Sequence, residues 1–402
     1  MASLLERYKA VKRRELLERV KTAIESGDHK GVSAALSRYS SYLGRDALAV
    51  LDSVIRGRMN DSLSHTDAST ALRSLATTYS PASIEGWFLV ESLGQAAGCF
   101  GAAAAFGEKG MVALSQSTTP HLAFIGALHT RNLQAATAAY QRGNSPGDEF
   151  WVDAGHYLWL WSKGTSGAAS WSNDSSWRAV VEGHNVAIIG PAPTPAGAKK
   201  ISASTLVARV IAPGVVTWPD TDIASGRCDL AYANSKTTKW FVREDKASLL
   251  EPFSFLSFRT DSGTALGIKN SRVAVHHKRL LPMPWDRTTM GPLAAWDLLH
   301  GPNVSVSISG TTFFASQTAY TANDVRFDAE RNQSTDQSGS TGIVLERCVS
   351  FSHHNIGGHV NLMANLAEAG ALSFDKDGAR VVALSYADYM AEIDQFYGVP
   401  RV

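Results

Sequence analysis

A short apolar run that ends at a glycine is the first candidate for chemistry in this chain. Val186 to Ile189 is β-branched and apolar, and Gly190 follows it directly. Such a run is typical of a buried strand, and a glycine at its end lets the backbone approach a ligand because glycine carries no Cβ. Ligands bind at the carboxyl ends of the strands of open α/β sheets. The segment therefore predicts the opening of a nucleotide-handling α/β domain.

The residues after Gly190 argue against a dinucleotide. The usual fingerprint for NAD or FAD needs three glycines and a helix that starts inside the motif. Here Pro191, Pro193 and Pro195 follow the glycine. Because proline has no backbone N–H, these positions cannot donate to a pyrophosphate.

The order of the following segments resembles a known family. A second apolar strand, Leu206 to Ile211, carries Arg209 inside it, and the run Gly226 to Asn234 reads Gly-Arg-Cys-Asp-Leu-Ala-Tyr-Ala-Asn. Together with Gly190 this order resembles the large donor-binding motif of sialyltransferases and of bacterial transferases that use CMP-activated 3-deoxy-ulosonic acids such as Kdo.

Two later segments extend the resemblance over roughly the C-terminal half. Thr288 to Leu299 is similar to the family's small motif, a Thr-x-Gly turn that opens a helix, and it is followed by the glycine-aromatic run at Gly310 to Phe314. Ser352-His353-His354-Asn355 precedes a helical stretch, as in the family's last motif, where a histidine precedes a helix. The order of the three motifs carries the likeness.

The resemblance implies a glycosyltransferase of surface polysaccharide synthesis. Its donor would be a CMP-linked 3-deoxy-ulosonic acid of the sialic acid or Kdo type, and its acceptor would be a glycan. Such a transfer needs a cytidine pocket, neutralisation of the leaving phosphate, recognition of the sugar carboxylate and a base for the acceptor hydroxyl. No metal is required for these steps, so we expect no metal and no further cofactor.

The resemblance also assigns roles to residues. His353 is the expected base, because an imidazole accepts a proton near neutral pH, although His354 stands where relatives place an acidic residue and either histidine can fill the role. The expected donor-binding residues are Gly190, Asn234, Thr288, Thr289, Gly291 and Gly310. Arg209 would meet the donor carboxylate.

Each assignment has a simpler structural alternative. The threonines before an apparent helix start can act only as an N-cap, and adjacent histidines can bond locally. A strand arginine such as Arg209 can pair with a nearby acid, and Asp229 is expected to fix a loop. Pro191 stands where relatives carry a small polar residue, which favours a second interpretation, a non-catalytic helical scaffold with a degenerate nucleotide fold. Another Rossmann-type enzyme is disfavoured by the missing glycines.

Composition sets limits on the class of protein. The 402 residues have a formal net charge of +1, which argues against a nucleic-acid partner because duplex binding relies on a basic excess.

Three distant cysteines, Cys99, Cys228 and Cys348, form no disulfide framework or zinc spacing and suit a reducing cytoplasm. No signal peptide or membrane span is expected. The basic, amphipathic start of the chain leaves a protein partner or peripheral contact with the inner membrane face open.

The pattern of apolar and polar residues changes near residue 180. Before it, helical periodicity places Leu16, Val20 and Ile24 on one face and Val32, Ala35, Leu36 and Tyr39 on another. We therefore predict an all-α, tetratricopeptide-like region of helical hairpins over 1–150, an aromatic-rich connecting segment over 151–180, and an α/β domain over 181–402. The connecting segment holds Trp151, Tyr157, Trp159, Trp161, Trp171 and Trp177, and these are expected to pack the two halves together.

Alternating strands and helices after residue 180 predict a Rossmann-like, mostly parallel sheet with flanking helices. The expected strands are Val186–Ile189, Thr205–Ile211, Leu230–Tyr232, Val273–His276, Val304–Ile308 and Val381–Leu384. The expected helices are Leu293–His300, His359–Ala369 and Tyr386–Tyr397.

Overall fold

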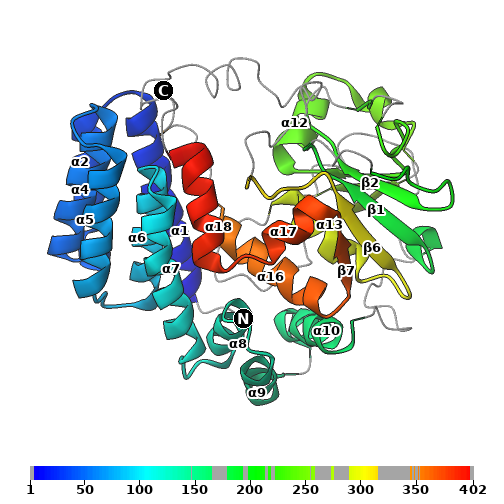
Figure 1. Ribbon diagram of the computed structural model, residues 1–402, viewed down its shortest axis with the longest axis horizontal. Helices are drawn as coiled ribbons and strands as arrows, with labels where there is room; N and C mark the ends of the chain where they lie inside the picture. The colour runs from blue at the N-terminus through cyan, green and yellow to red at the C-terminus, as the bar shows by residue number, and fades with distance from the viewer. Residues whose placement is uncertain are drawn as a thin grey trace.

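The computed structural model shows a mixed α/β protein with one parallel sheet and many helices (Figure 1). It describes residues 4–145, 147–164, 179–192, 198–212, 216–218, 222–253, 255–258, 273–275, 289–315, 345, 348, 352 and 354–398. Within these residues no helix has both the length and the apolar character needed to cross a membrane.

Helices alone form the first part of the chain. They are α1 (Leu4–Glu25), α2 (His29–Ser37), α3 (Ser40–Leu43), α4 (Arg45–Met59), α5 (His65–Thr78), α6 (Ile84–Ala96), α7 (Phe100–Ser115), α8 (Pro120–His129), α9 (Leu133–Gly143) and α10 (Glu149–Lys163). Neighbours in sequence pack together, as α1 with α2, α6 with α7 and α8 with α9. The two apolar faces predicted around Leu16 and Val32 are buried.

Local capping explains where several of these helices begin. The side chains of Asp28, Ser64, Asn132 and Asp148 each accept a hydrogen bond from a backbone N–H in the first turn of the helix that follows. Such caps satisfy N–H groups that have no partner within the helix. Short polar residues therefore mark the starts of α2, α5, α9 and α10.

Within the described residues, seven parallel strands form the sheet, which lies at the right of Figure 1. They are β1 (Asn185–Ile189), β2 (Leu206–Val210), β3 (Leu230–Ala233), β4 (Phe255–Phe258), β5 (Val273–Val275), β6 (Ser305–Ser309) and β7 (Leu372–Phe374). Their order is β5-β4-β3-β2-β1-β6-β7, and every described pairing is parallel. The order reverses between β1 and β6, as it does in Rossmann-like folds.

Helices accompany the sheet and complete the C-terminal part. These are α12 (Ser235–Arg243), the 3₁₀ turn η1 (Ala247–Leu250), α13 (Met290–Leu298), α16 (Ile356–Glu368), α17 (Lys376–Val382), α18 (Tyr386–Ile393) and the π-helical turn η3 (Asp394–Gly398). α13 packs against β1, β2 and β3. In Figure 1, α18 lies between α7 and the pair α16 and α17.

One strand prediction is wrong, and two strands of the sheet, β4 and β7, were not predicted. Val381–Leu384 was expected to be a strand, but Val381 and Val382 end helix α17, which starts where the Asp375 side chain accepts a hydrogen bond from Gly378 N. The cap and the burial of both valines on one helix face outweigh their β propensity. The strand here is β7, and β4 was missed because its Phe-Leu-Ser-Phe sequence shows no clean alternation although all four residues are buried.

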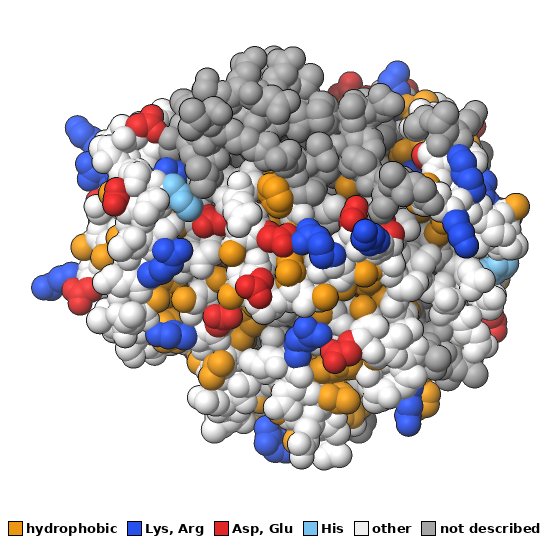
Figure 2. Space-filling view, viewed as in Figure 1, with side chains coloured by type: hydrophobic (Ala, Val, Ile, Leu, Met, Phe, Trp, Pro, Cys, Tyr) orange, Lys and Arg blue, Asp and Glu red, His pale blue; other side chains and the backbone are white. Residues whose placement is uncertain are grey.

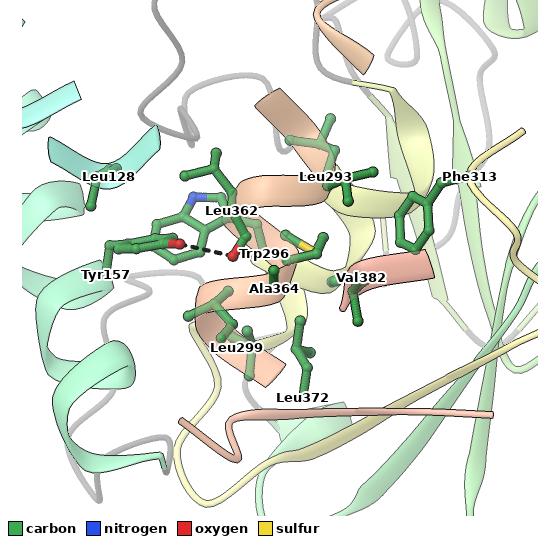
Figure 3. Packing of buried hydrophobic residues seen from close by; sticks show 14 of the residues in the cluster. Leu128, Tyr157, Leu293, Trp296, Leu299, Phe313, Leu362, Ala364, Leu372 and Val382 are labelled. Atoms are coloured by element: carbon green, nitrogen blue, oxygen red, sulfur yellow. Dashed lines mark hydrogen bonds between the residues drawn. The ribbon is translucent and has the colours of Figure 1, made fainter. Parts of the chain in front are cut away.

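One hydrophobic core runs through both parts of the chain (Figure 3). Trp151, Tyr157 and Trp161 of α10 are buried in it, whereas Trp159 is exposed. Tyr157 Oη donates to Leu362 O of α16 over 2.8 Å, the dashed line in Figure 3. Through its buried aromatic residues α10 thus packs against the C-terminal part, as predicted, but the prediction is wrong for the exposed Trp159, and Trp171 and Trp177 lie outside the described residues.

Candidate functional site

A cavity of about 300 Å³ lies at the carboxyl edge of the sheet, where the strand order reverses. The ends of β1 and β2, the turn after β6, the residue after β3 and the start of α13 line it. This is the place where open α/β sheets bind ligands, because the loops diverge on either side of the reversal and leave a crevice. Its volume falls at the lower end of the range for small-molecule sites.

The cavity brings together residues from all three sequence motifs. Of the predicted site residues, it is lined by Gly190, Asn234, Thr289, Gly291, Gly310 and His354. Thr288 and His353 lie outside the described residues. Arg209 does not line the cavity. Residues that the sequence reasoning missed are Ile188, Ile189, Pro191, Ala192, Val210, Ile211, Ala212, Met290, Pro292, Thr311, Thr312, Phe313 and Phe314.

Gly190 allows β1 to end in close contact with the turn after β6. Gly190 N donates to Ser309 O over 2.7 Å, and Ala192 N donates to Gly310 O over 2.9 Å. A Cβ at Gly190 would overlap Thr311 Oγ1 and Gly310 O. The missing side chain therefore serves a backbone-to-backbone contact that shapes the cavity, a reason for the glycine that the sequence did not reveal.

Gly310 continues this wall in a left-handed conformation, with φ +66°. Gly310 N donates to Asp375 Oδ2 over 2.7 Å, and the other oxygen of Asp375 accepts from Gly378 N at the start of α17. Asp375 N in turn donates to Ile308 O of β6. One carboxylate thus fixes both the turn after β6 and the helix beside it, and only the tertiary structure reveals this role.

The first turn of α13 forms the opposite side of the cavity. Thr289 is the N-cap residue, but its side chain makes no capping bond and its Oγ1 lies 3.2 Å from His359 Nδ1. A Cβ at Gly291 would meet no atom of the described residues within 4 Å outside its own helix backbone. Because the N–H groups of a first helical turn lack intrahelical partners, this open face offers backbone donors to a ligand.

Asn234 has a structural role and also faces the cavity. Its Oδ1 accepts from Thr237 N over 2.8 Å and caps α12. The side-chain nitrogen carries two further N–H donors, for which the described part of the chain provides no hydrogen-bond partner. The amide can therefore donate to a bound polar group while its oxygen holds the helix.

Among the described residues, His354 is the histidine that lines the cavity. Its carbonyl accepts from Ile356 N over 2.9 Å, and Asn355 follows it as the N-cap of α16. The ring is half-buried. An imidazole in this position has the chemistry of a general base near neutral pH.

Helix termini provide the positive potential of the cavity. The starts of α12, α13 and α16 all contribute residues to it or directly adjoin it, through Asn234, Thr289 and His354. The lining residues of this described cavity include no lysine, arginine, aspartate or glutamate. Helix N-termini carry partial positive charge and bare N–H groups, so the site favours an anion.

Arg209 has protein partners instead of a place in the cavity. Its Nη2 lies 2.5 Å from Asp222 Oδ2, its Nε donates to Arg227 O over 2.9 Å, and its guanidinium stacks 4.6 Å from the Trp218 ring centroid. The side chain is 4% exposed. The structural alternative for this residue, pairing with a nearby acid, is what the structure shows. Asp229 is likewise structural, since its Oδ2 accepts from Val207 N.

Over the described residues, no group of three or more histidine, cysteine or acidic side chains is placed to hold a metal ion. On the face in Figure 2, basic and acidic side chains are interspersed over the described surface, without a basic stripe. No protein-family model matches the chain, and neither a curated protein nor a solved structure matches it.

Proposed function

We propose that this protein is a sialyltransferase-like glycosyltransferase that moves a 3-deoxy-ulosonic acid from a CMP-linked donor to a glycan acceptor. One observation carries the proposal: six residues taken from three separate sequence motifs line the same cavity. They are Gly190, Asn234, Thr289, Gly291, Gly310 and His354. In sequence these motifs follow the order of the large, small and last motifs of that family.

The electrostatics of the cavity suit a nucleoside monophosphate. The leaving phosphate would lie against the first turn of α13, where Met290 N and Gly291 N are available as donors, and the helix dipole would stabilise its charge. The amide of Asn234 would read an edge of the base or ribose. Apolar walls such as Ile188 and Val210 would exclude water from the planar base.

His354 would act as the base from its position at the cavity, with His353 as the alternative. The imidazole would take the proton of the acceptor hydroxyl while that oxygen attacks the anomeric carbon of the donor. The bond from the anomeric carbon to the phosphate oxygen would break, and CMP would leave with the electron pair. After the step the imidazole holds the proton, and the phosphate of CMP holds the electron pair of the broken bond.

Recognition of the donor carboxylate needs a different residue from the one first expected. Arg209 is engaged with Asp222, so we assign the carboxylate to neutral donors at the end of β6, the hydroxyls of Thr311 and Thr312. Both threonines line the cavity on the side opposite α13.

The helical part would serve as a tetratricopeptide-like array of hairpins that holds a protein partner or the growing glycan. Consecutive helices pack in pairs, as α6 with α7 and α8 with α9, which is the packing that such arrays use. We propose that the enzyme works in the cytoplasm, at the inner face of the membrane, where a polysaccharide would be built before export.

A second candidate function is a scaffold that binds a nucleotide without catalysis. Pro191 at the cavity and the pairing of Arg209 with Asp222 favour it, since both remove a possible donor contact. The two candidates differ in turnover, because a scaffold would bind CMP but would not cleave a CMP-linked sugar.

Ligand-induced thermal stabilisation is the first test. Full-length protein is heated with CMP, CDP, UDP, NAD or S-adenosylmethionine, and a rise in Tm with CMP alone is expected. Stabilisation by NAD or S-adenosylmethionine and not by CMP would refute the proposal.

Hydrolysis of the CMP-linked donor then separates catalyst from scaffold. His353→Ala and His354→Ala are compared with His184→Ala, an exposed histidine just before β1, at the opposite edge of the sheet. Loss of turnover with retained CMP binding is expected in His353→Ala or in His354→Ala, with His184→Ala like the wild type. Unchanged turnover in both His353→Ala and His354→Ala would show that neither histidine is the base. Absence of turnover in the wild type would favour the non-catalytic scaffold.

A further inference from the structure

The turn after β6 has an unusual backbone. Phe313 and Phe314 have φ angles of +48° and +69°, in the left-handed region that residues with bulky side chains rarely adopt. Both residues line the cavity. Strain of this kind persists only where the surrounding structure holds it, and it concentrates at functional sites.

Contacts from the C-terminal helices hold this turn. Tyr389 Oη of α18 donates to Phe313 O over 2.6 Å, and Arg380 Nη2 of α17 donates to Ala315 O over 3.2 Å. The Phe313 ring packs 5.9 Å from the ring of Phe374 in β7. In Figure 3, Phe313 lies at the sheet side of the shared core, near Val382.

The hydroxyl of Tyr389 is suited to act as a lasting hydrogen-bond donor to Phe313 O. The side chain is 1% exposed, and burial holds the pKa of its hydroxyl well above the ordinary value, so that the group keeps the proton it donates. Its partner is a backbone carbonyl of the strained turn itself, so the bond acts directly on the cavity wall.

α18 also contacts the helical part of the chain. Tyr386 Oη hydrogen-bonds to Glu91 Oε1 of α6. Asp394, directly after α18, accepts from Phe100 N over 2.9 Å at the start of α7 and lies 3.1 Å from His65 Nε2. α18 packs along α7 as well, and Figure 1 shows it between the helical layer and α17.

We propose that Tyr389 is a positioning residue for the cavity, and that through it α18 ties the Phe313–Phe314 wall to the helical part. Its hydroxyl anchors the Phe313 carbonyl and keeps the turn in its left-handed form, with Phe314 against the bound ligand. The helical part is then a support for the site as well as a surface for partners.

Hydrogen exchange in the unliganded, full-length protein tests this without any ligand. Tyr389→Phe removes only the hydroxyl, and amide exchange in the segment 310–315 is expected to rise about five-fold, the effect of one lost hydrogen bond. The control is Tyr157→Phe, which removes another buried tyrosine hydroxyl that donates to a backbone carbonyl, that of Leu362, and leaves the contacts of α18 in place. Its exchange at 310–315 should match the wild type.

The result decides the proposal in either direction. Wild-type exchange at 310–315 in Tyr389→Phe would overturn it. An equal rise along the whole chain, or the same local rise in Tyr157→Phe, would also overturn it, because both would indicate a general loss of stability.

CMP affinity provides a second measurement, and this one rests on the proposed function. Titration calorimetry should show about five-fold weaker CMP binding for Tyr389→Phe and unchanged binding for Tyr157→Phe. Equal CMP affinity in Tyr389→Phe and wild type would remove the link between the turn and the ligand. A wild-type protein that binds no CMP would refute the proposed function, while the exchange experiment would still decide the role of Tyr389.

Discussion

The hydroxyl of Tyr232 donates a 2.9 Å hydrogen bond to Oδ2 of Asp297, and both side chains are buried. Tyr232 lies in β3, two residues before Asn234, and Asp297 lies near the end of α13, whose first turn faces the same cavity. The bond therefore joins the two elements that carry opposite walls of the site.

Loss of this bond should destabilise the protein. Tyr232→Phe is expected to lower the free energy of unfolding by about 1–3 kcal/mol, because it removes a hydrogen bond from a buried carboxylate. Denaturant unfolding measures the change. The control is Tyr140→Phe in α9, since Tyr140 is only partly buried. An unfolding midpoint like that of the wild type would mean that the Tyr232–Asp297 bond contributes nothing.

Alanine substitutions at two cavity glycines should affect different properties, stability at Gly190 and CMP binding at Gly291. Gly190→Ala places a methyl group on Thr311 and Gly310, and we expect a loss of about 1–3 kcal/mol of stability. The methyl group of Gly291→Ala meets no atom in the part of the chain that the structure describes, so stability should stay within about 0.5 kcal/mol while CMP binding weakens by about ten-fold as the methyl group enters the cavity. Thermal unfolding and calorimetry measure both. Unchanged CMP affinity in Gly291→Ala would place the ligand elsewhere.

Arg209 should matter for stability and not for the donor. Arg209→Met leaves the Asp222 carboxylate without its ion pair, and a loss of about 3 kcal/mol is expected because one charge of a buried pair is left uncompensated. The KM for the CMP-linked donor should stay unchanged in the folded fraction. A large rise in KM with little loss of stability would instead indicate that Arg209 binds the donor carboxylate.

The cysteine thiols should react slowly in the folded protein. Burial raises the pKa of Cys99 to about 11 and that of Cys228 to about 12. Since the thiolate is the reactive form, an aromatic disulfide reagent at pH 8 should label these thiols only after unfolding. The raised pKa values also mean that the thiols favour folding below the ordinary thiol pKa of about 9, and that this contribution disappears as the pH rises toward 11 and 12. Rapid labelling of native protein at pH 8 would contradict the burial.

Local patterns in the sequence predicted most of the sheet. The β-branched runs at Val186–Ile189 and Val304–Ile308 correspond to β1 and β6 within one residue. β1 is buried from Val186 to Ile189 and needs continuous apolar residues, whereas in β6 apolar residues alternate with serines and only the apolar ones are fully buried. The pair Val381-Val382 misled the prediction, since the Asp375 cap and helix packing decide its conformation.

The sequence by itself determined the order of the motifs, the strand ends at Gly190 and Gly310, and the helix start at Thr289, because turns, caps and apolar runs are set by neighbouring residues. Only the tertiary structure decided that Gly190 faces the turn after β6 while Gly291 lines the cavity, and that Arg209 pairs with Asp222. These facts depend on strand order and on contacts between distant segments. No local pattern encodes them, because side chains far apart in the chain meet only after the sheet has assembled.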